Sequence, residues 1–425
     1  MHYRSVLTGS AIVVACLFVT SAPVFAQGAP VYIVQFQAGL APAARGAAAA
    51  AAGAVVDRLF SGVSAAAVRV PNDQALAALR QHPAVLSVVP NRQMRAYQGA
   101  NGKGNKPGGS TGTQVTSAGV TRVGVPTAFS NGAGVGVAVL DTGIDLGHSD
   151  LAGTVDAFSA FGGSCQDDEG HGTHVAGIIG ARDNTLDVIG VAPGATIYCV
   201  KVLDGSGNGT DADVMAGLDW VLANHARVSP AIHVINMSLG REGSADDNPA
   251  MRDLVATLDT EGVLVVVAAG NDPSLDVNQQ VPSAYASVAP VASTTALTGS
   301  NACRFLASPI AADTASYFTS DGTGVTVSAP GEERENVSRG CMIQSVGILS
   351  TRLGGGTTRL SGTSMAAPHV AGIAARHYQI NPAFLPAEVR GFLAADANRY
   401  GTAPLDSPAG GYTFDGMREG VAQAP

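Results

Sequence analysis

The sequence of 425 residues contains little charge and few aromatic side chains. Charged residues make up 13% of the chain, aromatic residues 5%, and the formal net charge is −9 at pH 7. Its 24 lysines and arginines form no basic patch, so nothing in the sequence indicates a nucleic-acid partner. Hydrophobic residues make up 46%, which is ample for a large core, and the length allows two or three domains.

Long apolar runs are equally scarce. The run from Val6 to Val19 stands out, but it is too short to span a bilayer comfortably. Arg4 precedes it, and residues 24–26 (VFA) place small side chains where a signal peptidase needs them. We therefore expect residues 1–26 to be a secretory signal rather than a membrane anchor. The mature protein would be extracellular, or periplasmic if it crosses only an inner membrane.

Cysteine is rare, with five in the chain, and Cys16 would leave with the signal. Four cysteines in an exported chain suggest two disulfides, and three pairings are possible. We favour Cys165–Cys199 and Cys303–Cys341, because each pair encloses a loop of moderate length. The alternative is four buried thiols.

Residues 27–97 have the pattern of a small α/β module. The segments VYIVQFQ, AAAVRV and VLSVVPNRQM are typical of strands, and the alanine tract 41–52 and DQALAALRQHP are typical of helices. Residues 98–113 are rich in Gly, Asn and Lys without an apolar face, which indicates a flexible linker. Exposed loops of this kind are where proteases cut, so we place a maturation site within the linker.

From residue 114 to residue 400, apolar runs alternate with helical segments. VGVAVLD, ATIYCVKVL, HVINMSLG and GVLVVVAAG have the composition of buried strands, and HGTHVAGIIGA, DADVMAGLDWVLANHA and NPAMRDLVATLDTEG that of helices. This alternation predicts an α/β fold with a doubly wound parallel sheet, in which ligands bind at the carboxyl ends of the strands. Residues 401–425 form a tail too short for a further domain.

Four motifs lie at the boundaries of these elements. They are VLDTGID with Asp141, HGTHVAG with His171, AAGND with Asn271, and SGTSMAAPHVAG with Ser364. Ser364 precedes a helix-compatible run with Pro368 in its first turn, where helix N–H groups favour a developing negative charge. A serine hydroxyl is a poor nucleophile until a base takes its proton, so the chain needs a histidine and an orienting carboxylate. Taken singly, the motifs also fit a helix cap, a turn and an HxxH metal motif.

Together, these four motifs resemble those of the subtilisin-like serine proteases (subtilases), near the proteinase K and aqualysin branch. The resemblance implies a secreted, autoprocessed serine endopeptidase of broad specificity. Ser364 would be the nucleophile, His171 the base, Asp141 its orienting group and Asn271 a donor to the oxyanion. The alternative is a catalytically silent subtilase-fold protein that binds peptides. Such a protein usually lacks a triad residue, whereas all are present here.

The same resemblance implies partners. Residues 27–97 resemble, in position and pattern, the inhibitory propeptide of subtilases, which chaperones the protease domain and blocks its cleft until it is cut away. The mature enzyme is expected to act as a monomer on protein and peptide substrates, with no nucleic-acid partner and no membrane attachment.

Substrate contacts also follow from the resemblance. Two edge strands and one wall of the S1 pocket are expected to hold an extended peptide by β-augmentation. The matching residues are Ser238, Leu239, Gly240, Gly207, Asn208, Gly209, Ala268, Ala269 and Gly270. Gln280 and Asp272 are expected at the base and rim of S1, which would make its preference not purely apolar.

Calcium is the cofactor that the resemblance implies. The loop ARDNTLDV falls on the calcium loop of the family. The expected ligands are the side chains of Gln114, Asp150 and Asn184 and the main-chain carbonyls of Arg182, Leu186 and Val188. Six hard oxygens, one of them charged, suit Ca²⁺, and the alternative is a solvated polar loop.

Overall fold

The computed structural model describes residues 28–97, 113–400 and 414–425. The expected secretory signal lies outside these residues, as do all of the linker except Thr113 and the first half of the C-terminal tail. None of the helices within the described ranges is long and apolar enough to cross a bilayer.

Residues 28–90 form a small domain with its own core. A sheet of four strands in the order β2-β3-β1-β4 carries two helices, and β1 pairs antiparallel with both β3 and β4. Val34, Phe36 and Leu79 are buried at its centre. The elements are β1 (Val31–Phe36), α1 (Pro42–Ala51), β2 (Val55–Leu59), β3 (Ala65–Arg69), α2 (Asp73–Gln81) and β4 (Val85–Pro90).

One strand of the sequence analysis is two strands in the structure. The segment VLSVVPNRQM contains β4 in the small sheet and the start of β5 (Gln93–Ala96), which joins the large domain. The chain is held between them by α5 (Asp211–Asn224), because Asn91 Oδ1 accepts from Ala212 N at 2.9 Å and Arg92 O accepts from Asp211 N at 2.9 Å. The break therefore depends on a contact with a distant helix.

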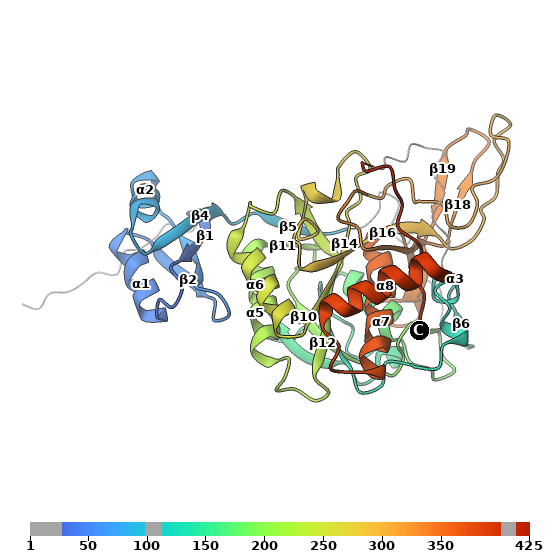
Figure 1. Cartoon of the computed structure of the whole chain (residues 1–425), viewed down its shortest axis with the longest axis horizontal. Coiled ribbons are helices and arrows are strands. Elements are labelled where there is room, and N and C mark those ends of the chain that lie inside the picture. The colour runs from blue at the N-terminus through green and yellow to red at the C-terminus, as the bar shows by residue number, and fades with distance from the viewer. Residues whose placement is uncertain (1–27, 98–112, 401–413) are drawn as a thin grey trace, which may run out of the picture.

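The large domain is built on a sheet of seven parallel strands in the order β17-β16-β14-β12-β7-β10-β8. Helices cover both of its faces, as the doubly wound prediction requires (Figure 1). The strands are β7 (Gly136–Asp141), β8 (Val155–Ser159), β10 (Thr196–Lys201), β12 (Ile232–Met237), β14 (Leu264–Ala268), β16 (Val288–Thr295) and β17 (Val327–Glu332). The main helices are α4 (His171–Gly180), α5, α6 (Pro249–Thr260), α7 (Thr363–Ile380) and α8 (Pro386–Tyr400).

The two faces of the sheet have separate cores. Residues of α4 and α7 pack with Val139, Val266 and Val291 on one face, and residues of α5 and α6 pack with Leu140 and Val267 on the other. Successive side chains of a strand point to opposite faces, so strands buried on both sides are continuously apolar.

Shorter elements surround the sheet. They are β6 (Val115–Thr116), α3 (Ala118–Arg122), β9 (Val188–Ile189), β11 (Asn208–Thr210), β13 (Leu239–Glu242), β15 (Gln280–Val281), β18 (Arg334–Val337), β19 (Ile343–Val346), β20 (Ile348–Thr351) and β21 (Thr357–Leu360), with 3-10 turns at Val125–Thr127, Ser149–Leu151 and Val277–Gln279. The hairpin β18–β19 projects from the body in Figure 1.

The small domain lies beside α5 and α6, and β5 extends from it into the large domain (Figure 1). Asp219 of α5 accepts hydrogen bonds from the backbone N–H groups of Ser61 and Gly62, at 2.9 and 2.6 Å. Gln35 of β1 donates to Asp253 of α6 at 2.7 Å. The two domains are therefore joined by specific polar contacts as well as by the connecting chain.

Helix α7 begins at Thr363, so Pro368 lies inside the helix and not in its first turn as the sequence analysis expected. A proline at this position has no N–H to offer to the carbonyl of the residue four before it, which is Ser364. The hydroxyl of Ser238 donates to that carbonyl at 2.9 Å and takes the place of the missing helical hydrogen bond. A contact from another element thus permits the proline.

Candidate active site

Asp141 and His171 form a buried pair. Asp141 ends β7 and His171 begins α4, and Asp141 Oδ1 lies 2.7 Å from His171 Nδ1, with both side chains inaccessible to solvent. Burial alone would lower the pKa of His171, but the negative charges of Asp141, Glu169 and Asp167, with the hydrogen bond to Asp141, raise it above its usual value. The site therefore favours a positive charge on this imidazole.

A second histidine, His174, lies one turn further along α4. Its Nε2 lies 3.0 Å from the carbonyl oxygen of Ile348, and burial lowers its pKa to about 3. A neutral, buried ring bonded to a backbone carbonyl has a packing role. Within the described ranges, no group of three or more His, Cys, Asp or Glu residues could hold a metal, so the HxxH spacing is not a metal site there.

Ser364 is the second residue of α7 and is fully buried. Its Oγ donates to the main-chain oxygen of Ser238 at 2.8 Å, while the Ser238 hydroxyl donates to the Ser364 carbonyl. His171 Nε2 is buried and has no hydrogen-bond partner among the described residues. The structure thus assembles the Asp–His pair but directs the serine hydroxyl to Ser238.

Asn271 follows β14 and is held by the residue before Ser364. Its Oδ1 accepts from Thr363 N at 2.9 Å and from Thr363 Oγ1 at 2.8 Å. These two donors fix which side of the amide carries the oxygen, so Nδ2 faces the other way. Asn271 Nδ2 donates to the carbonyl oxygen of Tyr97 at 2.9 Å.

Strand β5 lies between β11 and β13 and pairs antiparallel with both. Six of the residues expected to contact substrate lie on these flanking strands or next to them. Asn208 and Gly209 pair with Arg95 and Met94, Leu239 and Gly240 pair with Ala96 and Arg95, Gly207 O accepts from Ala96 N at 3.1 Å, and Ser238 O accepts from Tyr97 N at 3.2 Å. A chain segment thus occupies the place in which a substrate was expected.

The side chain of Tyr97 enters a pocket. Gln280, Asp272 and Asn271 line this pocket with Tyr97. A Cβ atom at Gly240 would lie 2.5 Å from the Tyr97 hydroxyl oxygen, so glycine makes the room for this ring. Ala268 and Ala269 are buried, and no hydrogen bond or strand pairing joins them to β5 in the part of the chain that the structure describes.

Sequence reasoning assigned no role to Tyr97. The available signal was an aromatic residue at the end of a strand-like segment, directly before the Gly-rich linker.

Four of the six expected calcium ligands, Gln114, Asp150, Arg182 and Val188, come together around one loop. Gln114 Nε2 lies 2.7 Å from Arg182 O and 3.4 Å from Val188 O, and Asp150 Oδ2 accepts from Val188 N at 2.9 Å. The second oxygen of Asp150 is buried without a hydrogen-bond partner among the described residues. An unpaired buried carboxylate oxygen beside two carbonyls fits a hard cation.

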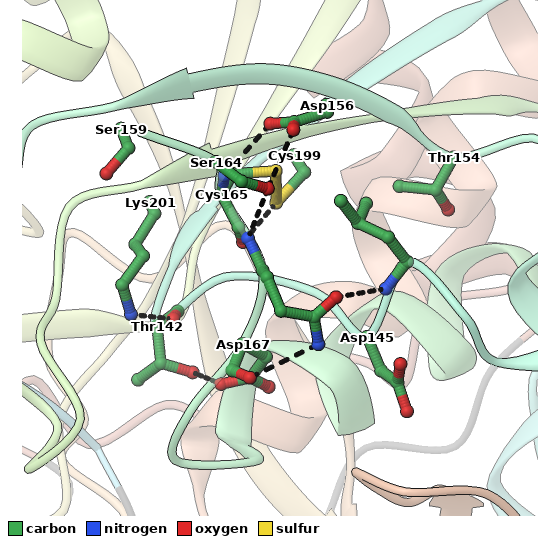
Figure 2. The surroundings of a disulfide bond; sticks show 12 residues. Thr142, Asp145, Thr154, Asp156, Ser159, Ser164, Cys165, Asp167, Cys199 and Lys201 are labelled. Atoms are coloured by element: carbon green, nitrogen blue, oxygen red, sulfur yellow. Dashed lines mark hydrogen bonds between the residues drawn. A yellow bond between two sulfur atoms is a disulfide. The ribbon is translucent and has the colours of Figure 1, made fainter. Parts of the chain in front are cut away.

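Both disulfides join the cysteines that the sequence analysis favoured. Cys165 pairs with Cys199 of β10, and Cys303 pairs with Cys341 at the hairpin β18–β19. Figure 2 shows the first disulfide in the same region as Thr142 and Asp167. The Cys165 carbonyl accepts from Ile144 N at 3.2 Å, so this bond anchors the loop that follows Asp141.

Comparisons with known proteins agree with this geometry. Residues 132–411 match the subtilase family. The chain is 36% identical over 366 residues to an extracellular serine proteinase of Thermus sp., covering 85% of this chain and 77% of that one. It is 37% identical over 291 residues to subtilisin Savinase of Lederbergia lenta, covering 68% and 93% of the two chains.

Solved structures are similar as well. A cold-adapted subtilisin-like serine proteinase superposes with a TM-score of 0.56 at 30% identity, covering 72% of this chain and 98% of that one. Fervidolysin from Fervidobacterium pennivorans, a keratinolytic enzyme related to subtilisin, superposes with a TM-score of 0.68 over 93% of this chain and 60% of that one. At 23% identity, the similarity to fervidolysin shows a shared fold alone.

Proposed function

The chain belongs to the subtilase family and is a serine endopeptidase, and we propose that Asp141, His171 and Ser364 are its catalytic triad. The buried Asp141–His171 pair, 2.7 Å apart, supports this assignment. In the proposed reaction, the Ser364 hydroxyl first gives up its hydrogen bond to the Ser238 carbonyl. Its proton then passes to His171 Nε2 as Oγ attacks the scissile carbonyl carbon. His171 then passes the proton to the leaving amine, and Asp141 stabilises the imidazolium between these steps.

Asn271 is the proposed side-chain donor to the oxyanion, acting with the backbone N–H of Ser364. Its amide is oriented by Thr363 and donates to a peptide carbonyl, that of Tyr97. A donor whose direction is set before the reaction needs no reorganisation when charge develops on that oxygen.

The observation that carries the proposal is the position of Tyr97. Its N–H is bonded to Ser238, its carbonyl oxygen to Asn271 and its hydroxyl to Gln280, as a residue preceding a scissile bond would be held. We infer that the enzyme cuts its own chain between Tyr97 and Gln98. This bond lies at the N-terminal boundary of the linker in which the sequence analysis placed maturation.

Residues 27–97 are accordingly proposed to be an inhibitory propeptide. While β5 pairs with both β11 and β13, no other extended peptide can occupy that position. The contacts of Asp219 and Asp253 with the small domain support a role in assembling α5 and α6 during folding. Export through the signal at residues 1–26 is part of the same proposal, and one relative is named as extracellular.

Calcium is the proposed cofactor. The side chains of Gln114, Asp150 and Asn184 and the carbonyls of Arg182, Leu186 and Val188 would hold it. The ion would supply positive charge that ties the segment at Gln114 to the body of the domain. It has no part in the proposed hydrolysis.

The test compares three precursors made in a protease-free system: wild type, Ser364→Ala and Ser361→Ala. Ser361 lies in the same motif, and its hydroxyl contacts Ser345. Wild type and Ser361→Ala should mature, begin with Gln98 on N-terminal sequencing and digest casein in a manner blocked by a serine-directed fluorophosphonate. Ser364→Ala should stay intact and inactive. Maturation of Ser364→Ala would refute self-cleavage, and a wild-type protein that binds peptides without cutting them would be a silent subtilase.

A further inference from the structure

The catalytic Asp141 and His171 lie on different elements, so another contact must set their separation. The first N–H groups of a helix have no partner inside it. At α4 the residue before the helix, Gly170, offers no side chain to fill this role. The first turn of α4 is therefore held by groups outside the helix.

Glu169 Oε2 accepts from His171 N at 2.8 Å and Thr142 Oγ1 accepts from Gly172 N at 2.9 Å, whereas one carboxylate, that of Asp167, binds both Thr173 and the two residues before the helix. Asp167 Oδ1 accepts from Gly170 N at 3.0 Å and from Glu169 N at 3.0 Å, and its Oδ2 accepts from Thr173 N at 3.0 Å and from Thr173 Oγ1 at 2.5 Å. The residue is only 4% exposed. Asp167 thus caps the helix that begins with His171, although it lies four residues before it.

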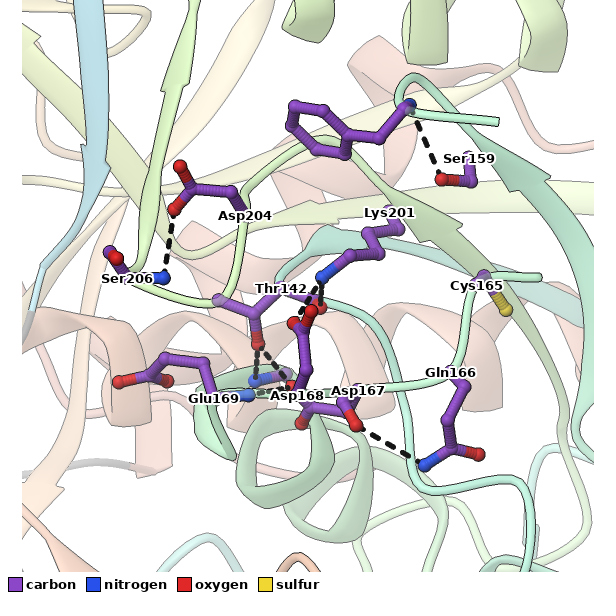
Figure 3. A network of polar contacts seen from close by, with 12 residues as sticks. Thr142, Ser159, Cys165, Gln166, Asp167, Asp168, Glu169, Lys201, Asp204 and Ser206 are labelled. Carbon is purple, nitrogen blue, oxygen red and sulfur yellow. Dashed lines mark hydrogen bonds and ion pairs between the residues drawn. The ribbon is translucent and has the colours of Figure 1, made fainter. Parts of the chain in front are cut away.

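The same carboxylate reaches the loop of the catalytic aspartate. Thr142, which follows Asp141, donates through Oγ1 to Asp167 Oδ1 at 2.9 Å. That hydroxyl oxygen also accepts from Gly172 N at 2.9 Å, so it contacts the residue after His171. Figure 3 shows Thr142 and Asp167 facing each other at the start of α4.

We propose that Asp167 is a positioning residue for the hydrolysis proposed above, on which this inference rests. By binding Thr142 and the first turn of α4 at once, its carboxylate sets the distance between Asp141 and the imidazole of His171. Its own backbone is anchored, because Asp167 N donates to Ile144 O at 3.1 Å and the Cys165–Cys199 disulfide lies two residues before it.

The site requires a carboxylate and not merely a polar side chain. All five groups that contact the Asp167 carboxylate are donors to it, and an ionised carboxylate is acceptor-only. An asparagine would turn an NH₂ group toward donors. A negative charge near a helix N-terminus is also favoured by the helix dipole.

The charge of Asp167 should affect the pH profile of the enzyme, which a residue that served only in packing would not do. The charged groups that face His171 are Asp141, Glu169 and Asp167, and each raises its pKa against the opposing effect of burial, while the nearby His174 is neutral. Removing the Asp167 charge should lower the pKa of His171. The acid limb of kcat/KM should then move to lower pH, because that limb reports the catalytic base of the free enzyme.

The experiment compares Asp167→Asn with Asp156→Asn in the mature enzyme. Asp156 is exposed and accepts hydrogen bonds from Cys165 N and Ser164 Oγ, in the segment just before Asp167 (Figure 2). No described contact joins it to α4, so it serves as the control. We expect kcat of Asp167→Asn to fall about 10- to 100-fold with KM within about twofold, as a misplaced catalytic group would produce. Its acid limb should shift downward, whereas Asp156→Asn should keep kcat within about twofold and its limb in place.

A second pair of variants serves if Asp167→Asn does not fold. Thr142→Val removes the hydroxyl that links Asp167 to Gly172, and Thr142→Ser retains it, so kcat should fall in the first and be rescued in the second. Equal kcat in the two Thr142 variants, or a profile of Asp167→Asn that matches that of Asp156→Asn, would overturn the proposal. An inactive wild-type enzyme would instead refute the proposed function.

Discussion

The hydroxyl of Tyr97 donates a hydrogen bond to Gln280 Oε1 at 2.5 Å, inside the pocket that receives the tyrosine ring. Tyr97 is 9% exposed and Gln280 is 3% exposed, so neither group has water as a ready alternative. Burial also raises the pKa of the Tyr97 hydroxyl, which keeps it protonated and able to donate. The pocket is therefore matched to an aromatic side chain with a polar end.

Gln280 should make the enzyme prefer tyrosine to phenylalanine before the scissile bond. Phenylalanine leaves the buried amide oxygen without a donor, which costs about 1–3 kcal/mol, so the expected preference in kcat/KM is about tenfold. Gln280→Leu should abolish or invert it, and Gln279→Leu, at the exposed neighbouring position, should retain it. Matched peptides that differ only in this residue provide the measurement. Equal rates for both peptides in the wild type would show that the amide does not select.

Asn271→Ala should lower kcat by about 100- to 1,000-fold, the range found when one oxyanion donor is removed. KM should change little, because the donor acts mainly on charge that develops in the transition state. Asn278→Ala, at an exposed position nearby, is the matched control. Single-turnover kinetics on a chromogenic peptide would measure the effect, and a loss confined to KM would argue for a role in ground-state binding only.

Calcium should protect the mature enzyme against inactivation by heat. A ligand that binds only the native state stabilises it by about 3 kcal/mol at a hundred times its dissociation constant. EDTA should therefore shorten the half-life on heating, with little change in initial activity at low temperature. Asp150→Asn removes the one charged ligand and should weaken the protection, whereas Asp183→Asn, exposed in the same loop, should not. Wild-type half-lives that are equal across a calcium series would show that the loop is only a polar turn.

Two buried carboxyls, Glu332 and Glu335, should make the fold less stable as the pH rises above about 4.5. Both are inaccessible to solvent, Ser345 Oγ donates to Glu332, and Tyr317 N donates to Glu335 at 2.9 Å. Burial, and for Glu332 also the charge of Glu335, raises the pKa of each above the ordinary glutamate value of 4.5. The folded state thus binds protons more tightly than the unfolded chain, so the free energy of unfolding falls as pH rises from about 4.5 through the folded-state pKa values.

Glu332→Gln should flatten this decline, because a neutral amide cannot ionise and can donate to Glu335. Urea unfolding of the inactive Ser364→Ala precursor, between about pH 5 and pH 9, gives the slope without self-digestion. Glu388→Gln, at an exposed position, should retain the slope of the parent. A parent protein of constant stability over this range would contradict the prediction.

Much of the fold could be predicted because its signals are local. The apolar run that ends at Asp141 is a strand buried on both faces, and the four motifs around Asp141, His171, Asn271 and Ser364 were recognisable as they stand. The alternation of such runs with helical segments led to the parallel sheet. Strand β2 was missed, because its residues Val55–Leu59 alternate between exposed and half-buried positions and include two charges.

What the sequence by itself determined is most of the elements and the motifs that carry the residues proposed for catalysis, since both depend on neighbours within one strand or one turn. Only the tertiary structure decided which groups from distant parts of the chain contact these elements and residues. Pro368 is tolerated inside α7 through Ser238, Tyr97 enters a pocket with Gln280, and Asp167 joins Thr142 to α4. The first two contacts span 126 and 183 residues, and such a contact leaves no periodicity in the sequence, because its energy arises only when the folded chain brings a buried donor to a buried acceptor.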